Sequence, residues 1–223
     1  MNYLELKDFL LSNADEKFSQ FSKTLSNSEY KVIGVKNPVL RQLVKEHTKD
    51  NELRVEDFEL GEYLEIDFIY FGLNLSKMKD IDAQLSFLKE NIRYAKSWAI
   101  TDTVSTYIKK HCFNKYFDFF KEMHKTSLTY ERRMAYILGL KHYREEDVLK
   151  VLKHINLNEE YMVMMAEAWL LATIAIQFPE EIYSFLKGCT DLTLKRKTIS
   201  KINESFRIEP SLKERFKSLR NVE

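Results

Sequence analysis

The chain has few of the residues that interrupt helices, with five glycines and three prolines among 223 residues. Glycine and proline are the least favourable residues in a helix interior and the strongest markers of turns and loops. Hydrophobic residues make up 44% of the chain and charged residues 31%, which is enough apolar material for a buried core. The composition predicts a fold dominated by long helices, with disorder confined to the ends.

Cysteine is also scarce, since the chain has only Cys112 and Cys189, which lie 77 positions apart. No CxxC motif or Cys/His cluster surrounds them, which argues against both a zinc site and a disulfide framework. The five histidines show no metal-binding spacing, and there is no Ser/His/Asp set or glycine-rich phosphate loop. We therefore expect two reduced, buried cysteines, no metal and no cofactor.

Long apolar runs are missing too. No stretch approaches the ~18 consecutive apolar residues that a membrane-spanning helix needs. The first 17 residues mix charges into a short apolar run, which is not the pattern of a targeting segment. We expect a cytoplasmic protein without a membrane partner.

An excess of charge of one sign is absent as well, because 35 Lys and Arg balance 34 Asp and Glu to a net charge of +1. Binding to duplex DNA relies on basic side chains that face phosphates, so this net charge alone does not support a nucleic-acid partner. The charges are unevenly spread, however. Residues 50–67 carry eight acids and one base, whereas residues 195–220 carry nine bases and three acids.

Apolar residues at the helical period run through the whole chain, with no competing strand pattern. Pro38, Pro179 and Pro210 stand where helices are expected to open, because proline is tolerated in the first turn. The short connections predict antiparallel neighbours. The predicted helices cover residues 2–12, 15–25, 38–49, 55–60, 62–76, 81–93, 97–110, 113–124, 129–141, 145–153, 158–176, 179–187, 193–204 and 210–220.

Helix pairs recurring about every 35 to 40 residues are typical of α-solenoids. We therefore predict an all-α, right-handed superhelix of HEAT-like or ARM-like repeats with a concave groove, formed as a single domain over residues 1–223. Trp98, Arg133 and Trp169 are separated by 35 and then 36 residues. This spacing predicts equivalent positions in three successive repeats, lining one concave face.

The helix predicted over residues 97–110 presents two side chains away from the core. At 100° per residue, Trp98 and Asp102 are neighbours at positions i and i+4, about 160° or more from Ile100 in the apolar stripe. An aromatic ring and a carboxylate are thus expected together on the outer face. W-x-x-x-D alone is a weak motif, and the alternative is a packing tryptophan beside a solvated acid.

Arg133 and Trp169, later in the chain, each have two possible roles. The Arg133 guanidinium can hold a phosphate through a bidentate contact, although Arg132 is a competing candidate and either can instead pair with a nearby acid. Met162 and Met165 share the side of Trp169 on a helix that is apolar nearly all round. These neighbours favour core packing for Trp169.

Several segments in order resemble the AlkD-like DNA alkylation repair family. The segments are YKVIGVKNPVLRQLVKE at 30–46, KSWAITDTV at 96–104, ERRMAYILGLKHY at 131–143, AEAWLL at 166–171, and the closing stretch 197–220. The resemblance covers nearly the whole chain. The sequence departs from the usual family pattern at Ala99, Ile100 and Ala172.

The resemblance implies a HEAT-like stack whose concave groove cradles duplex DNA containing alkylated bases. It implies a monofunctional glycosylase that acts as a monomer and removes alkylated, positively charged purines. Trp98, Asp102 and Arg133 match the family's catalytic residues, and Trp169 matches a further tryptophan in the groove.

If this function is right, a basic rim is expected on the C-terminal helices, although a solvated helix face explains the same charges. A non-catalytic protein of the same fold that binds distorted or branched DNA is an alternative function. A protein-interaction scaffold is another, and the near-neutral charge suits it. The expected rim residues are Lys195, Arg196, Lys197, Lys201 and Arg207.

Overall fold

The computed structural model describes residues 1–26, 30–50, 53–109, 113–143, 146–157 and 159–221. Within these ranges the chain is all-α, and its β pairing is limited to one isolated bridge between Lys31 and Tyr63. The helices divide into two compact units, Met1–Lys109 and Lys110–Glu223. The prediction of an all-α helical-repeat protein is confirmed, whereas the prediction of a single domain stays a prediction.

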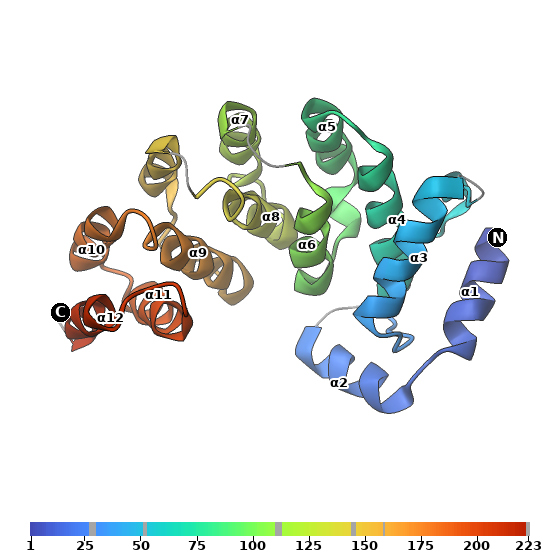
Figure 1. Ribbon diagram of the computed structural model, residues 1–223, viewed down its shortest axis with the longest axis horizontal. Coiled ribbons are helices and arrows are strands. Elements are labelled where there is room, and N and C mark those ends of the chain that lie inside the picture. The colour runs from blue at the N-terminus through green and yellow to red at the C-terminus, as the bar shows by residue number, and fades with distance from the viewer. Residues whose placement is uncertain (27–29, 51–52, 110–112, 144–145, 158, 222–223) are drawn as a thin grey trace. The chain divides into compact units, whose positions relative to one another are not determined.

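The first unit is centred on α4, whose apolar side chains are buried on nearly every side. This helix packs against α3 on one flank and α6 on the other (Figure 1). Residues of α1, α3 and α4 share one hydrophobic core. The elements of this unit are α1 (Tyr3–Ser12), α2 (Glu16–Ser26), α3 (Asn37–Asp50), η1 (Val55–Asp57), α4 (Leu64–Lys77), α5 (Ile81–Asn91), η2 (Ile92–Tyr94), α6 (Trp98–Val104) and η3 (Ser105–Tyr107).

The second unit is a stack in which α9 packs between α8 and α11 (Figure 1). A second layer covers these helices, because α7 packs on α8 and α10 packs on α9. The elements of this unit are α7 (Phe113–Met123), α8 (Thr129–Gly139), η4 (Glu146–His154), α9 (Tyr161–Ile174), α10 (Pro179–Gly188), α11 (Leu192–Glu204), α12 (Pro210–Lys217) and η5 (Ser218–Asn221).

The predicted helix over 97–110 is wrong at its C-terminal end. The α-helix stops at Val104 and is followed by the short 3-10 turn η3. Gln84 of α5 is responsible, because its buried amide donates to the carbonyl of Tyr107 at 3.0 Å and accepts from the backbone N–H of Lys109 at 2.9 Å. These bonds take backbone groups that a continuing helix would use internally.

The segment predicted as a helix over 145–153 is a 3-10 helix, η4. With three residues per turn, side chains three positions apart lie on the same face. Val148, Val151 and His154 follow this spacing, and both valines are buried. The ring of His154 packs edge-on against the rings of Phe120 and His124 from α7, with centroids at 6.1 Å and 5.4 Å. The 3-10 spacing thus places the two valines and His154 on one packed face.

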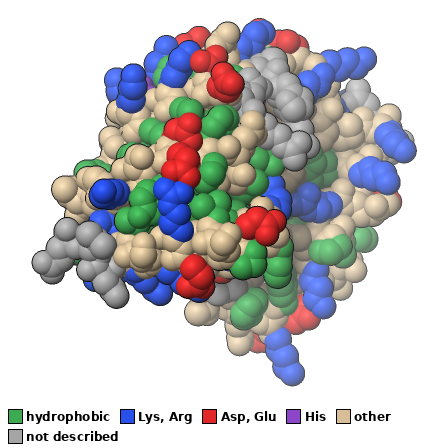
Figure 2. All heavy atoms as spheres, turned by 60° about the vertical axis from the view of Figure 1, so that its left-hand side comes forward, with side chains coloured by type: hydrophobic (Ala, Val, Ile, Leu, Met, Phe, Trp, Pro, Cys, Tyr) green, Lys and Arg blue, Asp and Glu red, His purple; other side chains and the backbone are tan. Residues whose placement is uncertain are grey.

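The structure tests the predictions for one of the two cysteines, for the surface charge and for membrane-spanning helices. Cys189 is a buried free thiol, and burial raises its pKa, whereas Cys112 lies outside the described residues. On the face shown in Figure 2, basic side chains are interspersed with acidic and apolar ones. In the part of the chain that is described, no helix has the length and apolarity needed to cross a bilayer.

Candidate active site

Helix α6 begins at Trp98 because Ser97 caps it. The buried Ser97 hydroxyl accepts a hydrogen bond from the Ala99 N–H at 3.2 Å, which satisfies one free donor of the first turn. Ile100 and Val104 are buried against α4, whereas Trp98 and Asp102 are partly exposed. The predicted orientation of this pair, away from the core, is confirmed.

The Asp102 carboxylate has a local hydrogen-bond partner. The hydroxyl of Thr101, a fully buried residue, lies 3.2 Å from both Asp102 Oδ1 and the Trp98 carbonyl oxygen, so its one proton is shared between two acceptors. A carboxylate has about four lone-pair sites, so it can accept from several donors at once. Asp102 is therefore a partly exposed acid beside a hydroxyl donor.

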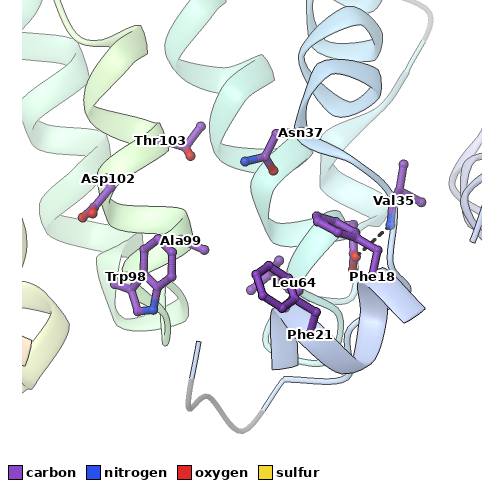
Figure 3. A pocket seen from close by; sticks show the side chains of 11 residues that line it. Phe18, Phe21, Val35, Asn37, Leu64, Trp98, Ala99, Asp102 and Thr103 are labelled. Carbon is purple, nitrogen blue, oxygen red and sulfur yellow. Dashed lines mark hydrogen bonds between the residues drawn. The ribbon is translucent and has the colours of Figure 1, made fainter. Parts of the chain in front are cut away.

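Trp98 and Asp102 border a recess of about 200 Å³ between α6 and α2. Phe18, Phe21 and Leu64 lie on one side of this recess and Trp98 with Ala99 on the other (Figure 3). The Asp102 carboxylate lies at the edge far from the phenylalanines. The described lining is completed by Ser22, Val35, Asn37, Glu65 and Thr103.

The position of α2 is set by the loop at residues 32–35. The buried Glu65 carboxylate accepts hydrogen bonds from the N–H groups of Ile33, Gly34 and Val35 at 3.0, 2.7 and 3.3 Å. Gly34 has a φ of +101°, and a Cβ there would lie 2.4 Å from the Asp15 carbonyl oxygen. Because only glycine permits this approach, the loop can bond to the start of α2.

A second buried carboxylate holds the segment that precedes α6. The Tyr30 hydroxyl donates to Asp67 Oδ2 at 2.7 Å and accepts from the Lys96 N–H at 3.1 Å. The Gly61 N–H also donates to Asp67, at 3.0 Å. Burial raises the pKa of Asp67 to about 6, against the lowering effect of these hydrogen bonds. The network fixes the chain two residues before Trp98.

Arg133 lies in the second unit, in a largely buried position on α8. Only 6% of its surface is exposed, and its Nη1 donates to the Met162 carbonyl oxygen of α9 at 2.6 Å. The guanidinium therefore links two neighbouring helices. Arg132 forms ion pairs with Glu159 and Glu160. The alternative that one of the two arginines pairs with a nearby acid therefore holds for Arg132.

The prediction that Trp169 packs in the core, made from its neighbours in the sequence, is wrong. Its side chain is 41% exposed, so it is not a core residue, although Ala168 and Leu170 on either side of it are fully buried. The pattern of apolar residues could not reveal this, because α9 is apolar nearly all round. Packing against α8 and α11 decides which part of such a helix stays exposed.

The prediction that Trp98, Arg133 and Trp169 line one face stays a prediction. They are the first residue of α6, the fifth of α8 and the ninth of α9. Each step therefore moves about one helical turn along the element, and the three side chains are half-buried, buried and exposed in turn. Trp98 lies in the first unit and the other two residues lie in the second.

The predicted basic rim is only partly exposed. Lys195 is 2% exposed, which does not fit a rim. Arg196 is exposed, and Lys201 forms an ion pair with Glu204 at 2.7 Å. The Lys197 ammonium lies over the Tyr161 ring, and the exposed Arg207 donates to the Tyr143 hydroxyl at 2.8 Å.

Phe18 and Phe21 were missed by the sequence reasoning. They lie three positions apart in the mostly polar segment EKFSQFSKTLS, so they share one face of α2. Phe21 is 59% exposed. Two aromatic residues on one face of a polar helix are the signal that could have identified them.

The fold and the recess together define a class of protein. It is an all-α helical-repeat protein that presents an aromatic ring and a carboxylate in a shallow recess. Among the described residues, no three His, Cys, Asp or Glu side chains gather as they would around a metal ion. All the described residues that line the recess belong to the first unit.

The chain belongs to the DNA alkylation repair enzyme family, which matches residues 6–202. The match includes Trp98, Asp102, Arg133 and Trp169. No curated protein matches the chain. Family membership places the chain in the repair of alkylated DNA and implies that it binds DNA.

Proposed function

We propose that this protein is a monofunctional DNA glycosylase that hydrolyses the N-glycosidic bond of alkylated, cationic purines in duplex DNA. The observation that carries the proposal is the pairing of Trp98 and Asp102 on the exposed face of α6, at the recess shown in Figure 3. Membership in a DNA alkylation repair family supports it.

The proposed chemistry needs one carboxylate. An alkylated purine already carries a positive charge, so it leaves as a neutral base when the C1′–N bond breaks and its electron pair stays with the base. Positive charge then develops on the deoxyribose, which Asp102 stabilises. Asp102 also orients the water that bonds to C1′, and the proton released from that water passes to solvent.

Trp98 stands one helical turn before Asp102, at the same recess. In the proposed complex its indole ring packs on the sugar and attracts the growing charge through a cation–π interaction. This interaction is stronger in the transition state than in the ground state, because the charge increases as the bond breaks.

DNA contacts are proposed for the second unit. Arg133 serves there as a phosphate ligand, and its bond to Met162 would orient the guanidinium. Exposed or half-exposed side chains of this unit are proposed to contact the sugar-phosphate backbone of the DNA. They are Trp169, Arg196, Lys197, Lys201 and Arg207. We propose that the protein acts as a monomer in the cytoplasm, without a metal or cofactor.

The test is the release of alkylated purines from methylated duplex DNA at low salt, comparing wild type with Asp102→Asn. We expect release by the wild type and a loss of about 100-fold or more in the variant, as for removal of an electrostatic catalytic group. Asp57→Asn is the matched control, because Asp57 is an exposed acid of the same unit outside the recess.

Equal release by wild type and Asp102→Asn would contradict the role of Asp102. If the folded wild type releases no base but binds DNA with strong salt dependence, it is a non-catalytic DNA-binding protein, because phosphate contacts release counterions. Absence of both activities would favour the interaction scaffold.

A further inference from the structure

The first unit carries Trp98 and Asp102, but the recess beside them offers DNA no positive charge. Among the described residues that line it, none is Lys, Arg or His, and two are carboxylic acids, Glu65 and Asp102. Glu65 already accepts three backbone N–H bonds, so the partly exposed Asp102 carboxylate is the charge that a ligand meets there. A phosphate that comes close to this recess is therefore repelled by Asp102.

The proposed reaction brings Asp102 close to phosphate groups. The carboxylate acts on C1′ of a deoxyribose, and a phosphate flanks that sugar on either side along the strand. A cation whose position relative to Asp102 is fixed would offset the repulsion and hold the phosphate in place. Side chains of the first unit meet this condition, because packing within the unit sets their position relative to Asp102.

Arg41 of α3 is placed for this role. It is an exposed residue, and its Nη1 donates to the hydroxyl oxygen of Thr106 at 3.3 Å. Thr106 follows Asp102 by four positions, in the 3-10 turn η3 that continues α6. The guanidinium is therefore bonded to a residue about one helical turn beyond Asp102.

The contact between Arg41 and Thr106 adjoins the recess. Asn37 of α3 and Thr103 of α6 line the recess and lie at the same edge of it (Figure 3). Arg41 comes four residues after Asn37, and Thr106 comes three residues after Thr103, so each stands about one turn beyond a lining residue. The guanidinium thus lies at the border of the recess.

The hydrogen bond to Thr106 orients the guanidinium without neutralising its charge. The Thr106 hydroxyl donates its own proton to the Thr103 carbonyl oxygen at 2.7 Å, so its lone pairs are free to accept from Arg41. A guanidinium has five N–H donors in a planar fork, and this contact uses one of them. The remaining donors can bind a phosphate through two parallel hydrogen bonds.

We propose that Arg41, oriented by Thr106, binds a backbone phosphate of the DNA strand on which Asp102 acts. The inference rests on the proposed function and adds a phosphate-binding residue to the unit that carries the catalytic pair. A phosphate contact at this place fixes the position of the strand beside Asp102. It also offsets the repulsion between the Asp102 carboxylate and that phosphate.

The test measures binding to a duplex with a tetrahydrofuran abasic analogue, which has no base to release, so the result does not depend on catalysis. We expect Arg41→Gln to weaken binding about tenfold at low salt, because a charge-assisted contact is lost. The slope of log K against log salt concentration should become shallower by about 0.9, the value for one phosphate contact. Lys89→Gln, at an exposed base of α5 outside the recess, is the matched control and should leave both unchanged.

Neutral methylphosphonates identify the phosphate that Arg41 contacts. Each phosphate near the analogue is replaced in turn, and the effect on binding is compared between wild type and Arg41→Gln. At the contacted phosphate we expect a loss of about tenfold in wild type and of less than about twofold in the variant, which already lacks the contact. Arg41→Lys should restore the salt dependence but only part of the affinity, since lysine keeps the charge and loses the planar fork.

Equal binding by wild type and Arg41→Gln, or methylphosphonate effects that are the same in both proteins, would overturn the inference. Coupling confined to the strand opposite the analogue would overturn it too, as would a wild type that does not bind the duplex. If the coupling appears but the glycosylase assay shows no base release, the phosphate contact is supported and the catalytic proposal fails. If Asp102→Asn abolishes base release while Arg41 shows no coupling, only the phosphate contact is wrong.

Discussion

Arg133 is a charged side chain in an almost fully buried position, and its surroundings define what its replacement would do. Its Nη1 donates to the Met162 carbonyl oxygen at 2.6 Å, which ties α8 to the first turn of α9. Hydrogen bonds from a charged donor are stronger than neutral ones. A loss of activity on replacing Arg133 therefore reports on helix packing as well as on any contact with DNA.

We expect Arg133→Met to lower the free energy of unfolding by about 2 kcal/mol, the typical contribution of a hydrogen bond to a charged group. Urea denaturation monitored by circular dichroism measures this change. Arg196→Met is the control, because Arg196 is exposed on α11 and its replacement should change stability by less than about 0.5 kcal/mol. Equal stability of the Arg133 variant and wild type would show that the Met162 contact contributes nothing.

At the level of elements, the candidate site depends on where one short helix ends. α6 has seven residues, and Gln84 of α5 takes the backbone groups that follow it. The Gln84 amide also donates to the Leu75 carbonyl oxygen at 2.8 Å, at the C-terminal end of α4. One buried side chain thus connects α4, α5 and the turn after α6.

Replacing Gln84 by Leu should destabilise the first unit by about 3 kcal/mol, because buried backbone groups lose their partners while the side-chain volume is kept. Thermal and urea unfolding measure the effect. Ser86→Ala, at an exposed position of the same helix, is the control and should be nearly neutral. An unchanged midpoint for Gln84→Leu would mean that other groups or water satisfy the backbone there.

For the whole molecule, two buried acids link stability to pH. Burial raises the pKa of Asp67 to about 6 in the first unit and that of Glu167 to about 8 in the second. An acid with a raised pKa in the folded state is penalised when it ionises. Its contribution to stability is complete below its unfolded pKa and is lost as pH rises through its folded pKa. Stability should therefore fall from about pH 4 toward pH 8.

Glu167→Gln should remove the part of this dependence that arises in the second unit. We expect the variant to be more stable than wild type at pH 9, by at most roughly 5 kcal/mol, since a tenfold difference in proton affinity corresponds to about 1.4 kcal/mol. At pH 5 the two proteins should differ little. Urea unfolding at pH 5, 7 and 9 measures the difference, with Glu181→Gln on the exposed face of α10 as control.

A difference between wild type and Glu167→Gln that is the same at all three pH values would contradict this account. The backbone N–H of Asn156 donates to the Glu167 carboxyl at 3.3 Å, so loss of that bond would lower stability equally at every pH. Only the ionisation of the buried acid gives a pH-dependent difference.

The sequence alone determined the helices and the orientation of Trp98 and Asp102. Apolar spacing predicted the elements within a few residues, because the helical period is a local property of the backbone. The positions of Trp98 and Asp102 on the outer face of α6 followed from the same 100° rotation per residue. Two errors in the helices, at the end of α6 and in η4, arose where side chains of another element contact the backbone or pack on the segment. The helix predicted over 55–60 was also wrong, because only the 3-10 helix η1 (Val55–Asp57) forms there.

Only the tertiary structure decided which of the candidate residues are accessible and what lies beside the acid. Trp169 is exposed, and Lys195 and Arg133 are buried, because neighbouring helices cover some faces and not others. The approach of Phe21 to Trp98 depends on the Glu65 carboxylate and the left-handed backbone at Gly34. These contacts join residues far apart in the chain, and the helical period of a single segment carries no information about them.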